Sequence, residues 1–503
     1  MDAQALTKVW VSAHQSVTQE VQTTLPIVEG ELPLDLRGVL YRNGPGRFSI
    51  GDQTYGHLFD GDGLVLRFAI GSTSSDSRPR IRYRNRFVRT DAFVHEERAG
   101  RMLYRGLGTN LPGGFLANAL RLRFKNPANT NVVYHGGRLL ALWEGGLPHQ
   151  LDPVTLDTLG RYDFAGSLLN RSEWWLDRRI SPHLPFSAHP KLDAASGELI
   201  NFGVVVGPHP RLHVYRVDRQ GQLIHDRVEP IGLEAFVHDF AITPNWLVFF
   251  VYPVSFDSAK VLLGTSTGID SLRPLPGSPT QVLLLPRNGG PARRFVASPC
   301  FVFHFANAFE DQQGQVIVDG CRQTEYPVMP PLSQALSGQL WDMPRAYLTR
   351  FVIDPQADEG SSLTETPLST QASEFPRIHP ARQGLPHRFI WGVSTAPGTP
   401  YNLYTSIVRH DVQTGELVQR QFSPWLPGEA VMVPKSSLVS DGAEDDGYLL
   451  SVLYHGQTHR SALHILDARS LQTLCVAQLP HHVPPGFHGN FVPAADCPPG
   501  WAI

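Results

Sequence analysis

The chain has 503 residues, of which 42% are hydrophobic and 18% are charged, so it can build a large core and has no composition typical of bulk disorder. Its 43 basic and 46 acidic residues give a net charge of -3, which disfavours nucleic acid as a partner. Four cysteines without a CxxC motif exclude a disulfide scaffold and a cysteine-built zinc site.

The first residues do not read as a targeting signal, because they lack a basic region followed by a continuous apolar stretch. The longest apolar run, residues 246–252, is far shorter than the roughly 20 residues that a membrane-spanning helix needs. These two observations predict a soluble, cytoplasmic protein.

Helical periodicity is confined to residues 4–21 and 115–124, so we expect a helical or extended N-terminal segment over residues 1–34. Strand-length apolar runs recur along the rest of the chain, for example at 64–70, 246–252 and 448–454. The segments expected to form hairpin turns between such runs are Asn43-Gly44, Gly136-Gly137, 193–197, 218–221, 288–290, 311–314 and Asp441-Gly442. The pattern predicts a mainly antiparallel all-β protein, and no interior linker divides residues 1–503 into separate domains.

Length then favours one all-β architecture over another. A two-sheet sandwich is too small for this chain, whereas seven four-stranded blades of about 45 residues use roughly 315 residues and leave room for insertions. A β-propeller is therefore favoured, although no repeated blade motif such as a WD dipeptide is present.

Familiar catalytic motifs are missing or incomplete. The chain has neither a P-loop signature nor GxGxxG, which argues against a bound nucleotide. The GxSxG match at residues 264–268 is followed by Pro274 and Pro276 where a nucleophile elbow needs a helix. An HExxH match begins at His95 but Ala99 ends it, which excludes a metalloprotease helix.

Four histidines lie in small or apolar company at strand edges, namely His189, His238, His304 and His488. A single histidine in such a place is more often a hydrogen-bonded core residue than a ligand. Because the four are far apart in sequence, only a closed, radially repeating fold could direct all of them to one point, such as the axis of a propeller.

Three isolated glutamates lie in apolar runs, namely Glu144, Glu374 and Glu429. Carboxylates are seldom fully buried without a partner, and the N–H of an imidazole that binds a metal through its other nitrogen is a suitable one. The alternative is that each glutamate is a partly exposed loop residue. Together with the histidines, the glutamates suggest a histidine site with carboxylate support.

Several longer motifs resemble those of the carotenoid cleavage oxygenases, and most closely those of the cyanobacterial apocarotenoid oxygenases. They are YRNGPGRF (41–48), HLFDGDGLVLRF (57–68), KNPANTNV (125–132), ALWEGG (141–146), the segments around His189, His238 and His304, and EDDGYLL (444–450). The resemblance runs from about residue 36 to residue 491. It implies a seven-bladed β-propeller with a dome of helices and loops over its top face.

The resemblance also implies roles for individual residues. It makes His189, His238, His304 and His488 the iron ligands, and Glu144, Glu374 and Glu429 the carboxylates that orient three of them. It places Thr130 beside an open coordination position. Four aromatic residues would line the substrate tunnel, although any of them could instead be ordinary core, namely Phe59, Trp143, Phe236 and Phe303.

Cofactors follow in part from chemistry and in part from the resemblance. Four imidazoles alone would accept zinc, copper, nickel or iron, so the resemblance supplies Fe(II), with O2 as co-substrate and no nucleotide, flavin or haem. Two departures from relatives are visible. His304 is followed by Phe305 where many relatives carry a second histidine, and the PDPCK loop of the vertebrate retinoid isomerase is absent, which counts against isomerohydrolase activity.

The activity that the resemblance implies is oxidative cleavage of a carbon-carbon double bond of an apocarotenoid to two carbonyl products, including a retinal-type aldehyde. Two alternatives stay open. The same site could cleave stilbenes or other phenylpropanoids, or the chain could be a metal-stabilised propeller that binds a partner without catalysis.

A membrane contact is expected because a long isoprenoid must leave a bilayer to reach the site. Helical spacing puts Phe115, Leu116, Ala119 and Leu120 on one stripe, with basic residues alongside, which is typical of a peripheral anchor. The alternative is that the stripe packs on the dome. The sequence leaves the oligomeric state open, with a monomer favoured.

Overall fold

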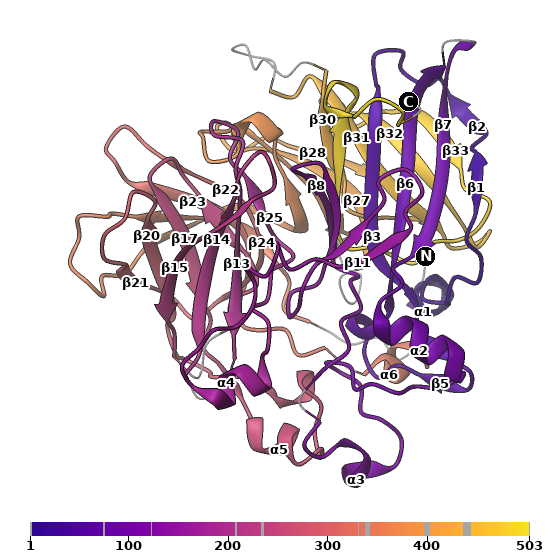
Figure 1. Cartoon of the computed structure of the whole chain (residues 1–503). Helices are drawn as coiled ribbons and strands as arrows, with labels where there is room; N and C mark the ends of the chain where they lie inside the picture. The colour runs from indigo at the N-terminus through magenta and orange to yellow at the C-terminus, as the bar shows by residue number, and fades with distance from the viewer. Residues whose placement is uncertain are drawn as a thin grey trace.

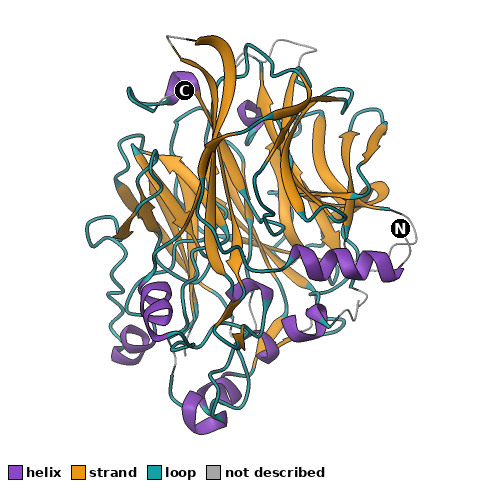
Figure 2. Ribbon diagram, turned by 90° about the vertical axis from the view of Figure 1, so that its right-hand side faces the viewer, coloured by secondary structure: helices purple, strands orange, loops and turns teal. Residues whose placement is uncertain are grey.

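The computed structural model describes residues 3–73, 76–121, 123–206, 209–232, 236–329, 331–337, 343–396, 403–435 and 444–501. This described part of the chain is mostly β, as predicted, with six sheets of four or more strands. Its helices are short and gather at one end of the molecule (Figure 1, Figure 2).

Four of the sheets follow one another in sequence order up to residue 297, and the first of them also takes in a strand from the C-terminal end of the chain. The first contains β1 (Gln22–Thr24), β7 (Asp76–Phe87), β6 (Asp62–Thr73), β3 (Gly38–Arg47) and β34 (Gly489–Pro493). The second contains β11 (Thr158–Arg161), β10 (His149–Leu151), β9 (Arg138–Leu142) and β8 (Asn131–His135). The third contains β12 (Lys191–Leu192), β13 (Leu199–Val205), β14 (Arg211–Val217) and β15 (Leu223–Pro230), and the fourth β16 (Phe240–Ile242), β17 (Trp246–Val251), β20 (Thr280–Pro286) and β21 (Arg293–Ala297).

Two larger sheets are built from residues after 300, and the second of them also takes in one strand from the N-terminal end of the chain. The fifth contains β22 (Phe301–Glu310), β23 (Val316–Gln323), β24 (Tyr347–Ile353), β25 (Thr364–Arg377), β26 (Phe389–Thr395), β27 (Tyr404–Asp411) and β28 (Leu417–Gln421). The sixth contains β2 (Ile27–Gly30), β33 (Thr473–Gln478), β32 (Arg460–Asp467), β31 (Gly447–His455), β29 (Trp425–Pro427) and β30 (Val431–Pro434). Two small pairs are β4 (Ser49–Ile50) with β5 (Gln53–Thr54) and β18 (Val254–Phe256) with β19 (Leu272–Pro274).

The fifth sheet has two parts that share the long strand β25. Residues 364–372 of β25 pair with β24, whereas residues 373–377 pair with β26. The two ends of the chain are also joined through sheets, because β34 pairs with β3 and β2 pairs with β33. Each of these joins ties an N-terminal strand to a C-terminal one.

Apolar cores join each sheet to the next and join the sixth sheet back to the first. Residues on facing strands of consecutive sheets share these cores, and examples in order are Val65 with Val132, Leu140 with Tyr215, Phe202 with Phe249, Phe250 with Phe351, Trp391 with Leu449, and Phe68 with Leu450. All of these side chains are buried, so hydrophobic burial on both faces holds the sheets in this order. The seven-bladed arrangement itself stays a prediction.

Five of the seven predicted turn segments connect paired strands. Gly136 and Gly137 have φ of 56° and 77° between β8 and β9, the positive values that a two-residue hairpin turn requires. The segments 193–197, 218–221, 288–290 and 311–314 likewise connect paired strands. Asp441-Gly442 lies outside the described residues.

The turn predicted at Asn43-Gly44 is wrong, because both residues lie inside β3. A Cβ at Gly44 would come within 2.5 Å of Gly486 Cα, so glycine here allows a close approach of two backbones instead of a turn. The Asn43 carbonyl accepts a hydrogen bond of 2.9 Å from the Phe487 N–H. The residue pair therefore positions the segment that precedes His488.

Of the helices in the described residues, only the first and the third lie in regions where helical periodicity was expected, and both are shorter than predicted; the other four were not predicted. The helices are α1 (Ala3–Ala13), α2 (Asp91–Ala99), α3 (Gly114–Asn118), α4 (Trp175–Ile180), α5 (Ser258–Leu262) and α6 (Leu332–Leu336), with single 3-10 turns at Leu58–Asp60, Ile269–Ser271, Pro380–Arg382 and Ala494–Asp496. Helix α1 ends at Ala13, although the helical periodicity of the sequence continues to residue 21. Beyond the helix the backbone bonds to another element, because Val17 N–H donates to the Gly46 carbonyl. None of the described helices has the length and hydrophobicity needed to cross a bilayer.

Candidate metal centre

The four predicted histidines come together at one point. His189 precedes β12, His238 precedes β16, His304 lies in β22 and His488 precedes β34, so each comes from a different sheet. Five of the six pairs of ring centroids are 4.5 to 5.6 Å apart. Ring nitrogens of His189, His304 and His488 lie within 4.8 Å of one another, and Nε2 of His189 lies 3.1 Å from Nε2 of His238.

Three of these imidazoles are held from behind by the three predicted glutamates. Nδ1 of His238 is 3.2 Å from Glu144, Nδ1 of His304 is 2.5 Å from Glu374, and Nδ1 of His488 is 2.8 Å from Glu429. A carboxylate accepts hydrogen bonds, so each Nδ1 carries the proton and each Nε2 keeps a lone pair for the centre. His189 has no carboxylate partner of this kind among the described residues.

The electrostatic surroundings of the rings differ. Burial, helped by the three neighbouring imidazoles, holds the pKa of His189 well below its ordinary value. Burial also lowers the pKa of His488 to about 3, against the opposing effect of Glu429. Burial opposes charge on His238 too, but the Glu144 carboxylate outweighs it and raises the pKa of that ring. The rings of His189 and His488 are therefore uncharged at neutral pH, so each could offer a nitrogen lone pair to a metal.

This donor set fits a divalent transition metal. Nε2 of His189 lies 3.1 Å from Nε2 of His238, whose lone pair faces the centre because Nδ1 of that ring faces Glu144, and a cation placed there could be bound by both rings. Imidazole nitrogens suit iron, zinc, copper and nickel, and the carboxylates behind three of the rings are the partners that metal-bound histidines usually have.

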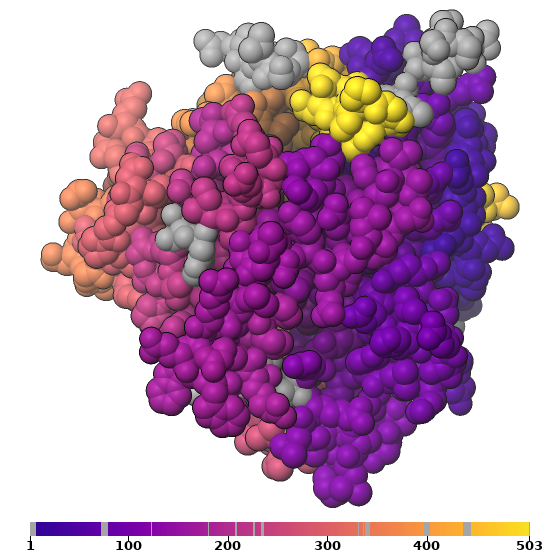
Figure 3. Space-filling view, in the orientation of Figure 1, coloured from indigo at the N-terminus to yellow at the C-terminus, as the bar shows by residue number. Residues whose placement is uncertain are grey.

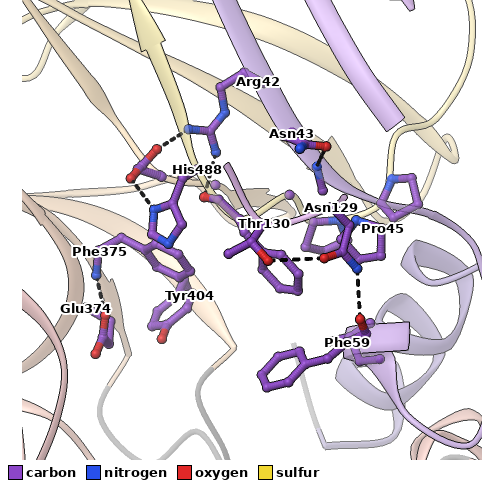
Figure 4. Close-up of a pocket in the computed structure, with 18 of the residues that line it drawn as sticks. Arg42, Asn43, Pro45, Phe59, Asn129, Thr130, Glu374, Phe375, Tyr404 and His488 are labelled. Carbon is purple, nitrogen blue, oxygen red and sulfur yellow. Dashed lines mark hydrogen bonds and ion pairs between the residues drawn. The ribbon is translucent and has the colours of Figure 1, made fainter. Parts of the chain in front are cut away.

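A cavity opens beside the histidines, and most of the predicted tunnel residues line it. Its walls include Phe59 and Thr130 (Figure 4). Trp143 and Phe303 line it as well. The Thr130 hydroxyl lies 3.2 Å from Oδ1 of Asn129 and donates to it, and the backbone carbonyl of Thr130 accepts from His488 N–H at 3.1 Å. Aromatic walls next to a polar metal-binding corner are typical of a site for a long apolar ligand.

Phe236 is placed differently from the other three aromatics. Its ring is nearly parallel to His238 at 6.4 Å and packs against Phe301 and Tyr326, and it is not among the residues that line the cavity. Phe236 therefore supports a histidine from behind in this structure.

Comparison with known proteins places this site in a family. A family model described as retinal pigment epithelial membrane protein matches residues 14–493. The chain belongs to this family. The membership confirms the resemblance to carotenoid cleavage oxygenases that the motifs predicted.

Relatives in the family match over nearly the whole chain. The apocarotenoid-15,15'-oxygenase of Synechocystis sp. is 36% identical over 492 residues, which cover 96% of each protein. Resveratrol cleavage oxygenase 1 of Aspergillus fumigatus is 31% identical, covering 93% of this chain and 92% of its own. The crystal structure of the cobalt-substituted Synechocystis oxygenase superposes with a TM-score of 0.87 at 35% identity, covering 97% of this chain and 99% of that one.

Sequence reasoning missed the arginines that hold Glu429 in this family member. Arg42 donates to one carboxylate oxygen, and Arg377 donates to the other at 2.9 Å. Burial alone would raise the pKa of Glu429, but the two arginines and His488 hold it well below its ordinary value. Arg42 belongs to the YRNGPGRF motif, and an arginine directly after the apolar residues 39–41 was the available signal.

Phe375 is a second residue that the sequence did not single out. Its ring lies 5.0 Å from His304 and 5.3 Å from His488, on the cavity wall. Its φ of 52° is a left-handed conformation that costs a phenylalanine about 1 to 3 kcal/mol. The sequence around Phe375 contains no residue pattern that predicts this backbone conformation.

The predicted membrane-contact residues are exposed in part, but the helical stripe is wrong. Phe115, Leu116 and Leu120 are 58%, 80% and 75% exposed, whereas Ala119 is half-buried. Helix α3 ends at Asn118, and Leu120 adopts a φ of 61° and donates its N–H to the Leu262 carbonyl of α5. Exposed Leu262 and Leu263 thus join the patch, at the end of the molecule where the helices gather (Figure 1, Figure 3).

Proposed function

We propose that this protein is a non-haem iron(II) dioxygenase that cleaves a carbon-carbon double bond of an apocarotenoid. The observation that carries the proposal is the meeting of four histidines, three of them held by glutamates, beside an aromatic cavity. In the overall reaction both atoms of O2 are inserted across the double bond, and two carbonyl products form, one of them a retinal-type aldehyde.

The proposed ligands are His189, His238, His304 and His488, and a ferrous ion bound there would supply the activation of O2. The protein's own part is positional. Glu144, Glu374 and Glu429 keep the protons of three rings on Nδ1, so that the Nε2 atoms face inward. Thr130 would border the position left open for O2.

The aromatic residues of the cavity would bind and align the polyene. Phe59, Trp143 and Phe303 offer flat apolar surfaces that exclude water and favour an extended conjugated chain. Phe236 would act one layer behind them, by fixing His238.

A second candidate substrate class has a specific observation in its favour. The fungal relative that matches over more than nine-tenths of both chains is named for cleavage of resveratrol, a stilbene. The same site would then cleave the double bond between two phenol rings. The motif resemblance and the 36% identity to an apocarotenoid oxygenase favour the polyene.

The fold that we infer for this function is a single seven-bladed β-propeller with its dome formed by the helices at one end. Cores that run from sheet to sheet and back to the first support it, as does the division of the fifth sheet at β25. A propeller directs one segment of each blade toward a common axis, which explains why histidines from four sheets meet.

We also infer that the dome touches a membrane surface. Phe115, Leu116, Leu120 and Leu263 expose apolar side chains together, and the substrate class dissolves in bilayers. A polyene that enters the cavity directly from the bilayer would not have to pass through water.

The test is to load the protein with iron(II) and incubate it with apocarotenals of several lengths and with resveratrol under ¹⁸O2. Aldehyde pairs from an apocarotenal, each carrying ¹⁸O when trapped quickly, support the proposal. Cleavage of resveratrol alone moves the function to stilbenes. Bound metal without oxygen uptake on any of these compounds contradicts both and leaves a binding role.

A further inference from the structure

His189 is the histidine of the metal centre whose ring has no carboxylate behind it among the described residues. Its backbone N–H donates to the Ser187 hydroxyl at 3.1 Å, a bond within its own segment of the chain. Its Nε2 nevertheless lies 3.1 Å from Nε2 of His238, which comes from another sheet. The contact that joins the two sheets beside these histidines is therefore important for the centre.

That contact is an ion pair between residues next to the two histidines. Nζ of Lys191, two positions after His189, lies 2.7 Å from Oδ1 of Asp239, the residue directly after His238. Lys191 begins β12 in the third sheet, and Asp239 immediately precedes β16 in the fourth. The side chain of Asp239 is 1% exposed and that of Lys191 is 14% exposed, so solvent screens their attraction little.

The same carboxylate also reaches a third metal-binding segment. Oδ2 of Asp239 accepts the backbone N–H of Phe305 at 2.9 Å, and Phe305 directly follows His304 in β22. Oδ1 additionally accepts the N–H of Phe240 at 2.8 Å. One buried carboxylate thus receives donors from the third, fourth and fifth sheets, each donor within two positions of a histidine of the centre.

His488 is positioned by a different set of bonds. Its carbonyl accepts the N–H of Asn43 at 2.8 Å, and its own N–H donates to the Thr130 carbonyl at 3.1 Å. Asn43 lies in β3 of the first sheet. The backbone beside three of the histidines is therefore tied to Asp239, and the fourth histidine is tied to the first sheet and to Thr130.

We propose that Asp239 positions the metal centre, and that through Lys191 it gives His189 the support that glutamates give to the other three rings. The inference rests on the proposed function, because it concerns the ligands of the metal that this function needs. Neither Asp239 nor Lys191 is among the described residues that line the cavity, so both are positioning residues that act through the backbone beside the histidines.

The physical reason is the precision that a metal centre requires. Its donors have to stay within about 0.5 Å of the productive geometry. Hydrogen bonds to a charged group are roughly twice as strong as neutral ones, so an ionised carboxylate that holds three segments resists their separation. Removal of the bond to Lys191 should let the segment of His189 move relative to that of His238.

The experiment follows the binding of cobalt(II), whose visible absorption depends on the number and geometry of its ligands. Lys191→Met removes the bond toward His189 and leaves both N–H bonds of Asp239 intact. We expect this variant to bind cobalt(II) roughly 10 to 100-fold more weakly, the usual effect of losing such support, and to change the spectrum of the bound ion. Lys191→Arg keeps the charge and should restore most of the affinity.

Arg287→Met is the matched control. Arg287 pairs with Asp193, and this ion pair joins the same two sheets, with side chains that are 16% and 12% exposed. Neither partner lies within three positions of a histidine of the centre. We expect Arg287→Met to lower the midpoint of urea unfolding in chelator, as Lys191→Met does, but to leave the affinity for cobalt(II) and its spectrum unchanged.

Unchanged affinity and spectrum in Lys191→Met would overturn the inference, and so would equal changes in Arg287→Met. If Lys191→Met does not unfold cooperatively, the double variant Lys191→Met, Asp239→Asn replaces it with the same expected loss, because it leaves no unpaired buried charge. If the wild type binds no cobalt(II), the proposed function fails together with the inference. If the wild type binds the ion and cleaves an apocarotenal while Lys191→Met binds the ion equally well, only the inference fails.

Discussion

Glu374 is a buried carboxylate whose hydrogen bonding is incomplete. One of its oxygens accepts from Nδ1 of His304 and from the Phe375 N–H, while the other has no partner among the described residues. Glu374→Gln keeps the shape but removes the charge that favours the Nδ1 proton. We expect iron affinity to fall by roughly 10 to 100-fold with the fold intact, the usual effect of losing such a partner.

Iron content after dialysis against a weak chelator measures this loss, and circular dichroism checks the fold. Glu416→Gln is the control, because that glutamate is exposed on the turn before β28. Full iron retention in Glu374→Gln would mean that the carboxylate has no part in holding the metal.

Arg42 neutralises a carboxylate that is itself buried. The side chains of Arg42 and Glu429 are 4% and 2% exposed, so removal of the arginine leaves a charge that solvent cannot stabilise. Although Arg377 remains, we expect Arg42→Met to lower the free energy of unfolding by about 3 kcal/mol in urea titrations at pH 7.

The pH dependence of that loss follows from the pKa of Glu429, which lies well below the ordinary value of 4.5. A depressed carboxylate pKa contributes stability that is complete above the unfolded pKa and is lost as the pH falls through the folded one. The difference between wild type and Arg42→Met should therefore be largest above about pH 5 and shrink below it, with chelator present throughout. A constant difference down to pH 3 would refute the electrostatic explanation.

Among individual residues, the sequence predicted polar side chains that lie in apolar runs. It missed residues whose role depends on contacts with distant parts of the chain. His189 and Glu374 are visible as polar residues in apolar runs. Arg42 meets Glu429 across 387 positions of the chain, and the left-handed Phe375 has no local signature. Long-range ion pairs and strained backbone are set by tertiary structure, so only the fold reveals them.

Helix α3 is the element on which the membrane proposal depends. We expect Phe115→Asp combined with Leu116→Asp to abolish flotation with anionic liposomes, because both side chains are exposed and apolar burial in the interface would be replaced by charge repulsion. Val28→Asp with Leu34→Asp is a control of nearly equal exposure, since those side chains are 58% and 75% exposed. Equal flotation of the two double variants would remove α3 from the contact.

Elements with local causes were predictable, and those with tertiary causes were not. The hairpin at Gly136-Gly137 needs only two residues that tolerate positive φ. Asn43-Gly44 has the same local chemistry, yet it is a straight part of β3 because Gly486 packs against it. Helix α3 similarly stops at Asn118, where the backbone of Leu120 turns to bond α5.

In the whole molecule, the arrangement of the sheets determines which parts of the chain a bound metal would connect. His189, His238, His304 and His488 come from four different sheets, so their spacing depends on how these sheets pack, including the pairing of β3 with β34. Strand-length apolar runs and turn residues predicted the β class, and the residue types suggested a histidine site with carboxylate support, whereas the roles of the histidines as iron ligands rested on the motif resemblance. Neither periodicity nor spacing could place residues that lie hundreds of positions apart.

A metal at this centre would tie those four sheets together, so it should stabilise the entire fold. Binding to the folded state alone adds about 4 kcal/mol when the free metal is a thousand times its dissociation constant. We expect anaerobic calorimetry to give a higher unfolding temperature with iron(II) than with chelator, rising with metal concentration. His488→Ala should abolish the rise, whereas exposed His209→Ala should preserve it. An unfolding temperature that is the same with and without iron would show that the four histidines do not hold it.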